Sequence, residues 1–353
     1  MNDLNQTPGC PMAKLNNINA DILKYVQGFV KKRYKNREKY RAFHAKTIGL
    51  VKAKLIVKEG LDEDLSVGLF SHPNKYYDAW IRFSNANNHN KVPDINAGVR
   101  GMAIKILLPA TDTIAMEKET SLKVHDIILT NNPTFFPSLP NMQLPGAKAG
   151  LGSKLDTAIN FVYVVTVSYF VRSLNGLRNF FKTIIKTPNI LEEMYFSATP
   201  YAFGEGRYIK WHVRPYKTIA SILPEKPTNN FLRERLIDDL LPNENTIGDE
   251  TYIEFGLFVQ FHENKETEPL DDSGVEWKTT FYEVATLRLP KQYIDTEERK
   301  ALDKEMSFSP GRAISAHRPC GSVNAIRTHL YEALAKERIA GLGDNGIKQT
   351  QQP

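Results

Sequence analysis

The sequence predicts an α+β fold in which helices flank a core of antiparallel strands. Apolar residues recur at helical spacing near both ends of the chain, within 18–43 and 323–340. Between these two segments, short apolar stretches are separated by Gly, Pro and Asn clusters, which is typical of strands and turns. The chain shows neither a strand–helix rhythm nor a Gly-x-Gly-x-x-Gly motif, so a parallel nucleotide-binding sheet is disfavoured.

The composition is that of a folded domain with a sizeable core. The chain has 353 residues, of which 41% are hydrophobic and 24% are charged, and these are ordinary globular values. A disordered chain or a coiled coil is therefore excluded as the main structure. The 46 Lys and Arg against 40 Asp and Glu give a formal net charge of +6.

The first expected element is a helix over 18–43, the main part of a helical arm assigned to 1–40. Apolar side chains between Ile22 and Phe29 follow helical spacing. The stretch Lys31–Arg41 then carries seven basic residues and a single acid. Such a stripe is typical of a solvated helix face. Because no RNA- or DNA-binding motif accompanies it, no nucleic-acid partner is expected.

Short strands fill the middle of the chain. They are expected at 48–57, 78–84, 100–108, 208–213, 252–261 and 281–289. In 252–261 every second residue from Ile253 to Phe261 is apolar, whereas the intervening residues are mixed. A strand with one wholly apolar face is expected in the wall of a barrel. The chain closes with the helix over 323–340 and a polar tail, 341–353.

A further apolar segment, 155–186, is expected to be helical. Its most apolar run, Ile159–Val171, has 13 residues, whereas a membrane-spanning helix needs ~20. A core helix is the preferred interpretation. The alternative is a lipid-contacting or membrane-surface element, in which Arg172 and Arg178 meet a lipid carboxylate.

The cysteines and the first residues bear on the compartment. Cys10 and Cys320 do not suffice for a disulfide framework, and no Cys/His cluster has the spacing of zinc ligands. The start of the sequence lacks the basic and apolar regions of a secretory signal. The sequence therefore predicts reduced cysteines and a cytoplasmic location.

One face of the last helix carries a phenol between guanidinium groups. At about 100° per residue, Tyr331 lies about 40° and Arg338 about 20° from Arg327 around the helix axis. Nearby positive charge favours the phenolate form of a tyrosine. An anionic phenol oxygen is a proximal ligand that ferric haem can use. The alternative is a half-buried tyrosine flanked by solvated arginines.

Three other segments carry polar side chains in specific positions. His44 stands between the basic helix and the first strand. Arg82 and Ser84 share one face of their strand because side chains alternate. The stretch 126–136 reads as a polar turn that ends in paired aromatic residues.

Together these motifs resemble those of the haem catalases. The matching segments are Arg41 to Lys46, Ile81 to Ser84, Arg100 to Lys105, Asp126 to Phe136, and Arg327 to Tyr331 with Arg338. The resemblance covers 40–136 well, 195–290 loosely and 327–338 in pattern. Since Tyr331 lies near the end of the sequence, the chain is similar to the shorter, bacterial catalase-related proteins.

The resemblance implies a catalase-like antiparallel β-barrel and a haem b domain over 41–340. It assigns His44 as the distal acid/base, with Ser84 fixing its tautomer. It assigns Tyr331 as the iron ligand. The remaining implied roles are cofactor-binding: Arg41, Arg82 and Arg338 would meet the haem propionates, Arg327 would keep Tyr331 a phenolate, and Phe43 and Phe135 would line the distal side.

The chain departs from the catalase pattern at one catalytic position. Catalases carry an asparagine that helps to orient peroxide where this chain has Thr130. A one-residue shift would let Asn131 take over, but the gapless match to Pro133 and Phe135 argues against it. The resemblance therefore does not extend to efficient disproportionation of hydrogen peroxide.

Three functions stay open at this point. The first is a haem-dependent hydroperoxidase of the catalase or peroxidase type, acting on hydrogen peroxide or an organic or lipid hydroperoxide. The second is a fatty-acid hydroperoxide lyase or allene oxide synthase. The third is a non-catalytic haem-binding protein. A homo-oligomer is a further option, and the other histidines, including His125 and His317, are expected to be surface or locally bonded residues.

Overall fold

The computed structural model describes most of the chain. The described residues are 16–33, 41–86, 90–109, 123–135, 185–217, 220–242 and 252–339, together with Met116, Lys148 and Ile159. Most of the 155–186 segment lies outside these residues, so its expected helix and lipid contact stay predictions. None of the described helices is both long and apolar enough to cross a membrane.

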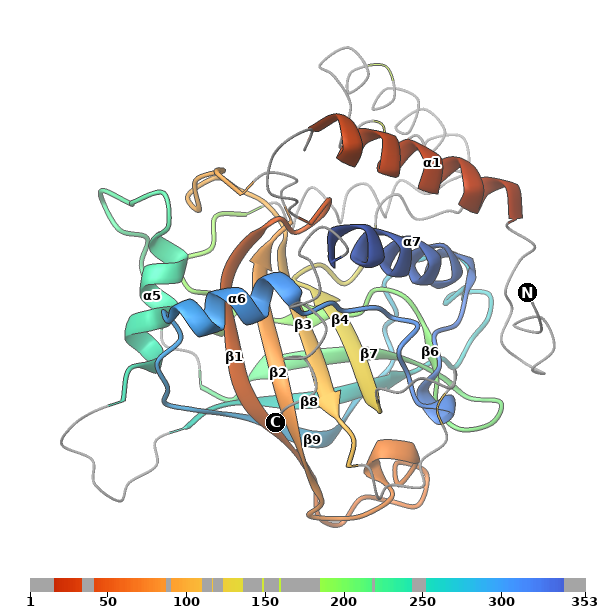
Figure 1. Ribbon diagram of the computed structural model, residues 1–353. Helices are drawn as coiled ribbons and strands as arrows, with labels where there is room; N and C mark the ends of the chain where they lie inside the picture. The colour runs from red at the N-terminus through yellow and green to blue at the C-terminus, as the bar shows by residue number, and fades with distance from the viewer. Residues whose placement is uncertain are drawn as a thin grey trace.

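The described strands form a single antiparallel sheet that closes into a barrel (Figure 1). They are β1 (Lys46–Val57), β2 (Tyr76–Asn85), β3 (Arg100–Leu107), β4 (Val124–Thr130), β5 (Tyr195–Phe196), β6 (Tyr201–Ala202), β7 (Tyr208–Pro215), β8 (Tyr252–Phe261) and β9 (Phe281–Pro290). Their order is β5-β4-β3-β2-β1-β9-β8-β7-β6, and a pairing of β5 with β7 joins the two ends. Eight strands therefore form the closed ring, and β6 adds to it at β7. The predicted α+β class and barrel are confirmed.

Alternation along each strand sorts side chains between the barrel interior and its outer face. In β2, Tyr77, Ile81 and Phe83 belong to the main buried core. The intervening Arg82 and Ser84 face a cavity outside the barrel. This alternation follows from the two-residue period of a strand. The barrel wall thus presents polar groups to one outer site without interrupting its core.

Helices cover parts of the barrel. They are α1 (Asn16–Arg33), α5 (Phe231–Leu240), α6 (Glu297–Glu305) and α7 (Ser322–Ile339), with 3-10 turns η1 (Gly68–Phe70), η3 (Ile190–Glu192) and η4 (Ser315–His317). Figure 1 shows α1 lying along α7. The two are joined by a small cluster that includes Ile22, Val26 and Ile326. The terminal helix was predicted correctly, whereas α5 and α6 were not predicted.

Two predicted elements differ in the structure. The described part of the first helix runs to Arg33, and 41–45 are not helical, with bends at 42–44. The stretch predicted as a polar turn after Asp126 begins as a strand, since β4 runs to Thr130. The polar His125 and Asp126 in this strand are both fully buried. Burial of polar residues on a strand hides the alternation by which a sequence reveals it.

Cys320 differs from expectation, and the two histidines His125 and His317 are locally bonded residues of the core. Cys320 is buried and disulfide-bonded, and its partner lies outside the described residues. This removes reduced cysteines as an argument for the predicted cytoplasmic location. His125 and His317 are both 0% exposed, with ring centroids 5.9 Å apart in the barrel core. Ile314 N–H donates to His125 Nδ1 and Leu69 N–H donates to His317 Nε2, so both are locally bonded, as one of the two expected alternatives states.

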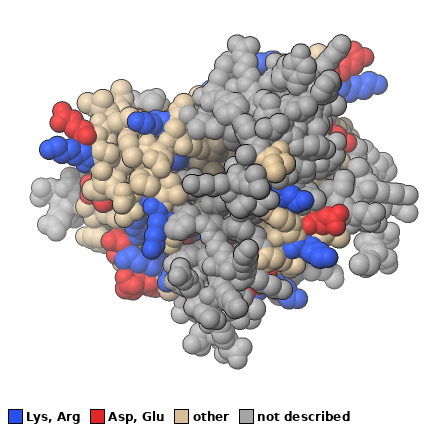
Figure 2. All heavy atoms as spheres, turned by 90° about the horizontal axis from the view of Figure 1, so that it is seen from above, with Lys and Arg blue, Asp and Glu red and all other residues tan. Residues whose placement is uncertain are grey.

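Most of the basic stretch Lys31–Arg41 lies outside the described residues, so the expectation of no nucleic-acid partner stays a prediction. On the face seen in Figure 2, Lys and Arg side chains lie among Asp and Glu side chains. The described part of this face shows no broad patch of one sign.

Candidate functional site

A cavity with about 990 Å³ of empty space lies between the outer face of the barrel and α7. Its lining comes from residues 41–44, from β2, β3 and β4, from Ser307 and Phe308, and from α7. This volume includes space that is open to solvent. The cavity therefore unites segments from both ends of the sequence.

The register of three strands builds the barrel side of this cavity. Two rows of residues line it, Ser84–Gly101–Thr130 and Arg82–Ala103–Ile128. Within each row the residues are direct partners on neighbouring strands. Because the two rows are two residues apart on each strand, both point to the same face of the sheet.

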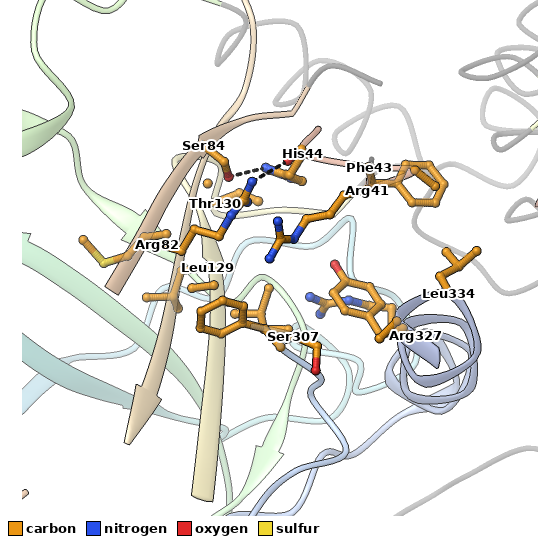
Figure 3. A pocket seen from close by; sticks show the side chains of 18 of the residues that line it. Arg41, Phe43, His44, Arg82, Ser84, Leu129, Thr130, Ser307, Arg327 and Leu334 are labelled. Atoms are coloured by element: carbon orange, nitrogen blue, oxygen red, sulfur yellow. Dashed lines mark hydrogen bonds between the residues drawn. The ribbon is translucent and has the colours of Figure 1, made fainter. Parts of the chain in front are cut away.

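His44 lies at one side of the cavity with its ring held by Ser84 (Figure 3). Its Nδ1 is 3.0 Å from the Ser84 hydroxyl oxygen, and Arg82 donates a hydrogen bond of 3.0 Å to the His44 carbonyl. His44 has a φ of 51°, in the left-handed region that non-glycine residues seldom adopt. A Cβ on Gly101 would stand only 2.5 Å from His44 Nδ1, so a glycine is needed there.

His44 is held in its neutral form. Burial, together with the positive charges of Arg82, Arg327 and Arg41, lowers the pKa of His44 to about 3. A neutral imidazole has one nitrogen that can accept a proton. If Nδ1–H donates to Ser84, Nε2 is that nitrogen.

Three arginines meet around one carboxylate at the edge of the cavity. Arg82 Nε donates to Asp303 Oδ1 at 2.8 Å, and Arg41 Nη1 lies 3.7 Å from Asp303 Oδ2. Arg41 and Arg338 both donate to the carbonyl oxygen of Met306, at 2.6 and 2.9 Å. Arg338 Nη1 is buried and has no hydrogen-bond partner among the described residues.

This cluster has an excess of positive charge. Three guanidinium groups against the carboxylate of Asp303 leave two positive charges unbalanced. Burial, together with Arg82, lowers the pKa of Arg338 to about 10. Burial alone would raise the pKa of Asp303, but Arg82 and Arg41 outweigh it and hold the pKa at about 2. The cluster therefore favours the binding of anionic groups.

The α7 side of the cavity carries Tyr331 and Arg327. Both residues line the cavity, and the Arg327 guanidinium lies 5.6 Å from the Tyr331 ring and 5.3 Å from the Phe135 ring. Arg327 Nη1 donates to Thr199 Oγ1 at 2.8 Å and to Asn324 Oδ1 at 3.1 Å. Its Nε is buried without a hydrogen-bond partner among the described residues. Figure 3 shows Arg327 across the cavity from His44 and Ser84.

The structure brings ten of the eleven candidate residues to this single cavity. They are Arg41, Phe43, His44, Arg82, Ser84, Thr130, Phe135, Arg327, Tyr331 and Arg338. Their sequence positions span almost 300 residues, so only the fold explains their convergence.

The exception is Asn131, which does not line the cavity. Its Oδ1 accepts a hydrogen bond of 2.8 Å from the Arg100 backbone N–H, and its Nδ2 donates to Glu193 at 3.1 Å. Both ends of the amide are thus used in holding the barrel wall. The suggestion that Asn131 replaces the family asparagine is not supported by these contacts. Thr130 does reach the cavity, and its hydroxyl donates to the Asn132 carbonyl at 3.3 Å.

Sequence reasoning missed Asp303, the carboxylate at the centre of the arginine cluster. It lies in α6, a very polar helix with no buried residue. Its partner Arg82 is 221 residues away in the sequence. Nothing local distinguishes Asp303 from the exposed acids around it. No group of three or more His, Cys, Asp or Glu residues that could hold a metal ion occurs within the described ranges.

Comparisons with known proteins identify the fold. No protein-family model matches the chain, and no curated protein matches its sequence. A bacterial catalase structure matches with a TM-score of 0.66 at 17% identity, over 99% of this chain and 67% of that one. A fungal catalase matches with 0.60 at 16% identity, over 98% and 67% of the two chains. Catalase A from Saccharomyces cerevisiae matches with 0.59 at 14% identity, over 98% and 70%.

These matches confirm the resemblance to catalases at the level of fold. The chain has a catalase-like β-barrel with flanking helices, and the similarity spans nearly its whole length. At sequence identities of 14–17%, these matches show a shared fold and nothing more. Activity and cofactor must therefore be argued from the site.

Proposed function

We propose that this protein is a haem-dependent enzyme that processes hydroperoxides. The observation that carries the proposal is one cavity in which a neutral histidine faces a tyrosine–arginine pair, with a basic cluster at its edge. His44, Ser84 and Thr130 would act on the peroxide. Tyr331 would be the iron ligand.

The residues of the cavity fit haem b in charge. Haem carries two propionate groups, and the arginine cluster has two positive charges in excess. The unpartnered Arg338 Nη1 offers a donor to such a carboxylate. We assign Arg41, Arg82 and Arg338 to the propionates.

The cavity also fits haem b in polarity. Apolar residues between the two sides, including Ile128, Phe135 and Leu334, suit a porphyrin. Phe43 and Phe135 would cover its faces. Arg327 would stabilise the phenolate of Tyr331 through its positive charge.

Haem iron, when bound, supplies the binding and reductive cleavage of the peroxide O–O bond. His44 would take a proton from the bound peroxide at Nε2 and return it to the leaving oxygen. Ser84 would keep the Nδ1–H tautomer in place. Because the pKa of His44 is about 3, the imidazole is ready to accept that proton throughout the neutral range.

Organic hydroperoxides are favoured over hydrogen peroxide as substrates. The Thr130 hydroxyl already donates to the Asn132 carbonyl, so it does not provide the amide donor of the family asparagine. The lining is also largely apolar between His44 and α7, with Leu129 and Leu334 among its residues. A lyase or allene oxide synthase reaction stays an alternative, because most of the apolar segment that favours it lies outside the described residues. A purely haem-binding role has no use for the His44–Ser84 pair.

Haem binding by Tyr331 is the first prediction and tests the proposal. The purified full chain is incubated with haem, and its absorption spectrum is recorded. We expect stoichiometric haem with a tyrosinate-type ferric spectrum, and loss of this spectrum in Tyr331→Phe, because phenylalanine has no ligand oxygen. Tyr76→Phe is the control, since Tyr76 is 60% exposed on β2.

Two results would contradict the assignment. One is a wild-type chain that takes up no haem. The other is a Tyr331→Phe protein with an unchanged haem spectrum. Kinetics on hydrogen peroxide and on an organic hydroperoxide, measured side by side, then define the substrate.

A further inference from the structure

A second cavity lies beside the first, beneath α6. It encloses about 1,160 Å³ of space, part of it open to solvent, and is bordered by α6, the start of β1, Asn230 and Arg233. Arg41 and Arg338 border both cavities. Of the α6 residues that line the second cavity, only Asp303 also has a role at the first cavity.

The lining of the second cavity is strongly basic. Seven Lys and Arg side chains border it, against the two acids Glu297 and Asp303. Further acids from outside the lining neutralise part of this charge. Lys46 pairs with Asp94 at 2.8 Å, and Asp295 is shared between Arg233 at 2.7 Å and Lys300 at 3.1 Å. The cations still outnumber the acids.

Arg299 is the lining cation whose surroundings point most directly to a ligand. Its guanidinium lies 4.6 Å from the centre of the Trp80 ring. Its Nη1 is buried and has no hydrogen-bond partner among the described residues. Burial lowers the pKa of Arg299, and the nearby Glu298 opposes this only in part. The charge of Arg299 is thus partly removed from water without a full counter-charge.

Arg338 also borders the second cavity, but its unpartnered Nη1 is the donor assigned to a propionate in the first. Asp303 is bonded to Arg82 and flanked by Arg41, which commits these charges to the first cavity. The carboxylate of Asp303 is held by Arg82, Arg41 and Thr47 and not by Arg299. A second anionic group therefore has a place at Arg299, apart from the propionate positions.

We propose that the second cavity binds a small organic anion through a carboxylate or phosphate group, with Arg299 as the recognising residue. A guanidinium fork matches both groups through paired N–H donors. The contact with Trp80 holds the guanidinium of Arg299 at the border of the cavity. Binding needs no haem, so the proposal stands apart from the proposed function.

The test is a titration of the full chain with inorganic phosphate and, separately, with succinate at constant ionic strength. Binding is followed by calorimetry and by tryptophan fluorescence, since Trp80 lies under Arg299. We expect saturable binding of at least one anion. Arg299→Gln should weaken it roughly tenfold or more, because a buried charged hydrogen bond is lost. Arg299→Lys should weaken it less, since the charge remains.

The chain offers a matched control for Arg299. Arg288 also lies over an aromatic ring, at 4.8 Å from Tyr252, but it pairs with Glu254 on the barrel wall at 2.7 Å. Arg288→Gln should leave anion binding unchanged. Trp80→Phe should remove the fluorescence response while calorimetric binding remains.

The outcomes separate the alternatives. Saturable binding that Arg299→Gln weakens and Arg288→Gln does not supports the site, whether phosphate or succinate is the anion bound. Binding that never saturates, or that both variants weaken equally, overturns it. The titration is repeated on the haem-loaded chain. Loss of binding there would assign the cavity to the haem carboxylates and overturn a separate site.

Discussion

At the residue scale, the backbone of His44 is the unusual feature of the site. A left-handed non-glycine residue costs of order 1–3 kcal/mol, and His44 has a φ of 51°. The bonds from Arg82 to its carbonyl and between its ring and Ser84 hold it in place. Strain kept by surrounding contacts is typical of a functional position. The sequence offers no sign of it, because the conformation depends on partners from β2.

Replacement of His44 tests its role as the acid/base. His44→Ala should retain haem, because Tyr331 and the arginine cluster are untouched. Peroxide cleavage should fall by ~10²–10⁴-fold, the usual size of a general acid–base contribution. Stopped-flow absorbance of the haem-loaded protein measures the rate. An unchanged rate would remove His44 from the mechanism.

Gly101→Ala tests whether the position of the His44 ring matters for the rate. Its Cβ would stand 2.5 Å from His44 Nδ1 and 2.9 Å from Ser84 Oγ, so the ring must move. The rate should fall with haem retained, as for His44→Ala. A full rate in this variant would mean that the His44–Ser84 bond does not set the rate.

Thr130 is expected to set the preference between peroxides. Thr130→Asn should raise turnover of hydrogen peroxide relative to an organic hydroperoxide, because an amide can donate to the small peroxide. The ratio of the two kcat/KM values is the measurement. Asn131→Ala is the comparison, since the Asn131 amide is used by Arg100 and Glu193 and should not shift the ratio. An unchanged ratio in Thr130→Asn would exclude Thr130 as the discriminating residue.

At the element scale, α6 shows how a polar surface helix can be essential to a buried cluster. It has no buried residue and was not predicted, because an apolar stripe is the main sequence signal of a helix. Its Asp303 nevertheless accepts hydrogen bonds from Arg82 and from Thr47, the latter at 2.7 Å. The helix is thus attached to the barrel through charge as well as through Leu302, which packs against a buried apolar cluster.

Removal of this charge should destabilise the protein, and haem should reduce the effect. Asp303→Asn leaves three buried guanidinium groups without a carboxylate, and breaking a buried pair costs about 3–5 kcal/mol. The loss of unfolding free energy should be larger without haem, because the propionates supply replacement charge. Urea unfolding of both forms measures it.

The exposed ion pair between Asp64 and Arg207 provides the control for this measurement. The Asp64 side chain is 89% exposed, so Asp64→Asn should cost less than about 1 kcal/mol. An equal loss in Asp303→Asn with and without haem would contradict the assignment of the arginines to the propionates.

The strands show which elements a sequence can reveal. β8 was predicted with its exact bounds of Tyr252–Phe261, because one of its faces is wholly apolar. β4 was missed, because buried His125 and Asp126 interrupt its apolar residues. Asp126 is paired with Lys105 at 2.6 Å, a partner on β3 that local sequence does not indicate. Tertiary contacts decide which polar residues are buried, and local sequence does not show these contacts. The candidate residues were found because they belong to known motifs, whereas Asp303 belongs to none of them.

At the scale of the whole molecule, buried histidines link stability to pH. Burial lowers the pKa of His44 to about 3 and of His212 and His317 to about 4, and it lowers that of His125 as well. Their value in an unfolded chain is about 6.5. Between these limits the unfolded chain binds protons that the folded chain does not. Stability must therefore fall as the pH drops below about 6.5.

A drop in pH from 7 to 5 should therefore lower the unfolding free energy of this protein. Between pH 7 and pH 5 the unfolding free energy should fall by about 2 kcal/mol for each fully buried histidine, which is 1.5 pH units at about 1.4 kcal/mol each. Urea midpoints at the two pH values measure the change. His317→Gln should reduce the pH dependence, whereas substitution of the exposed His329 should not. Equal midpoints at pH 7 and pH 5 would contradict the buried, neutral histidines.

The way in which the barrel closes determines where its sheet should open locally. The ring is completed by the two-residue β5, whose pairing with β4 consists of Thr130 opposite Phe196. All neighbouring strands of the ring that do not involve β5 are joined by at least four residue pairs. This short seam is where the sheet should open most readily, and its amide protons should exchange with deuterium ahead of those in β1 and β2. Since Thr130 is one side of the seam, each such opening would loosen the wall of the cavity itself.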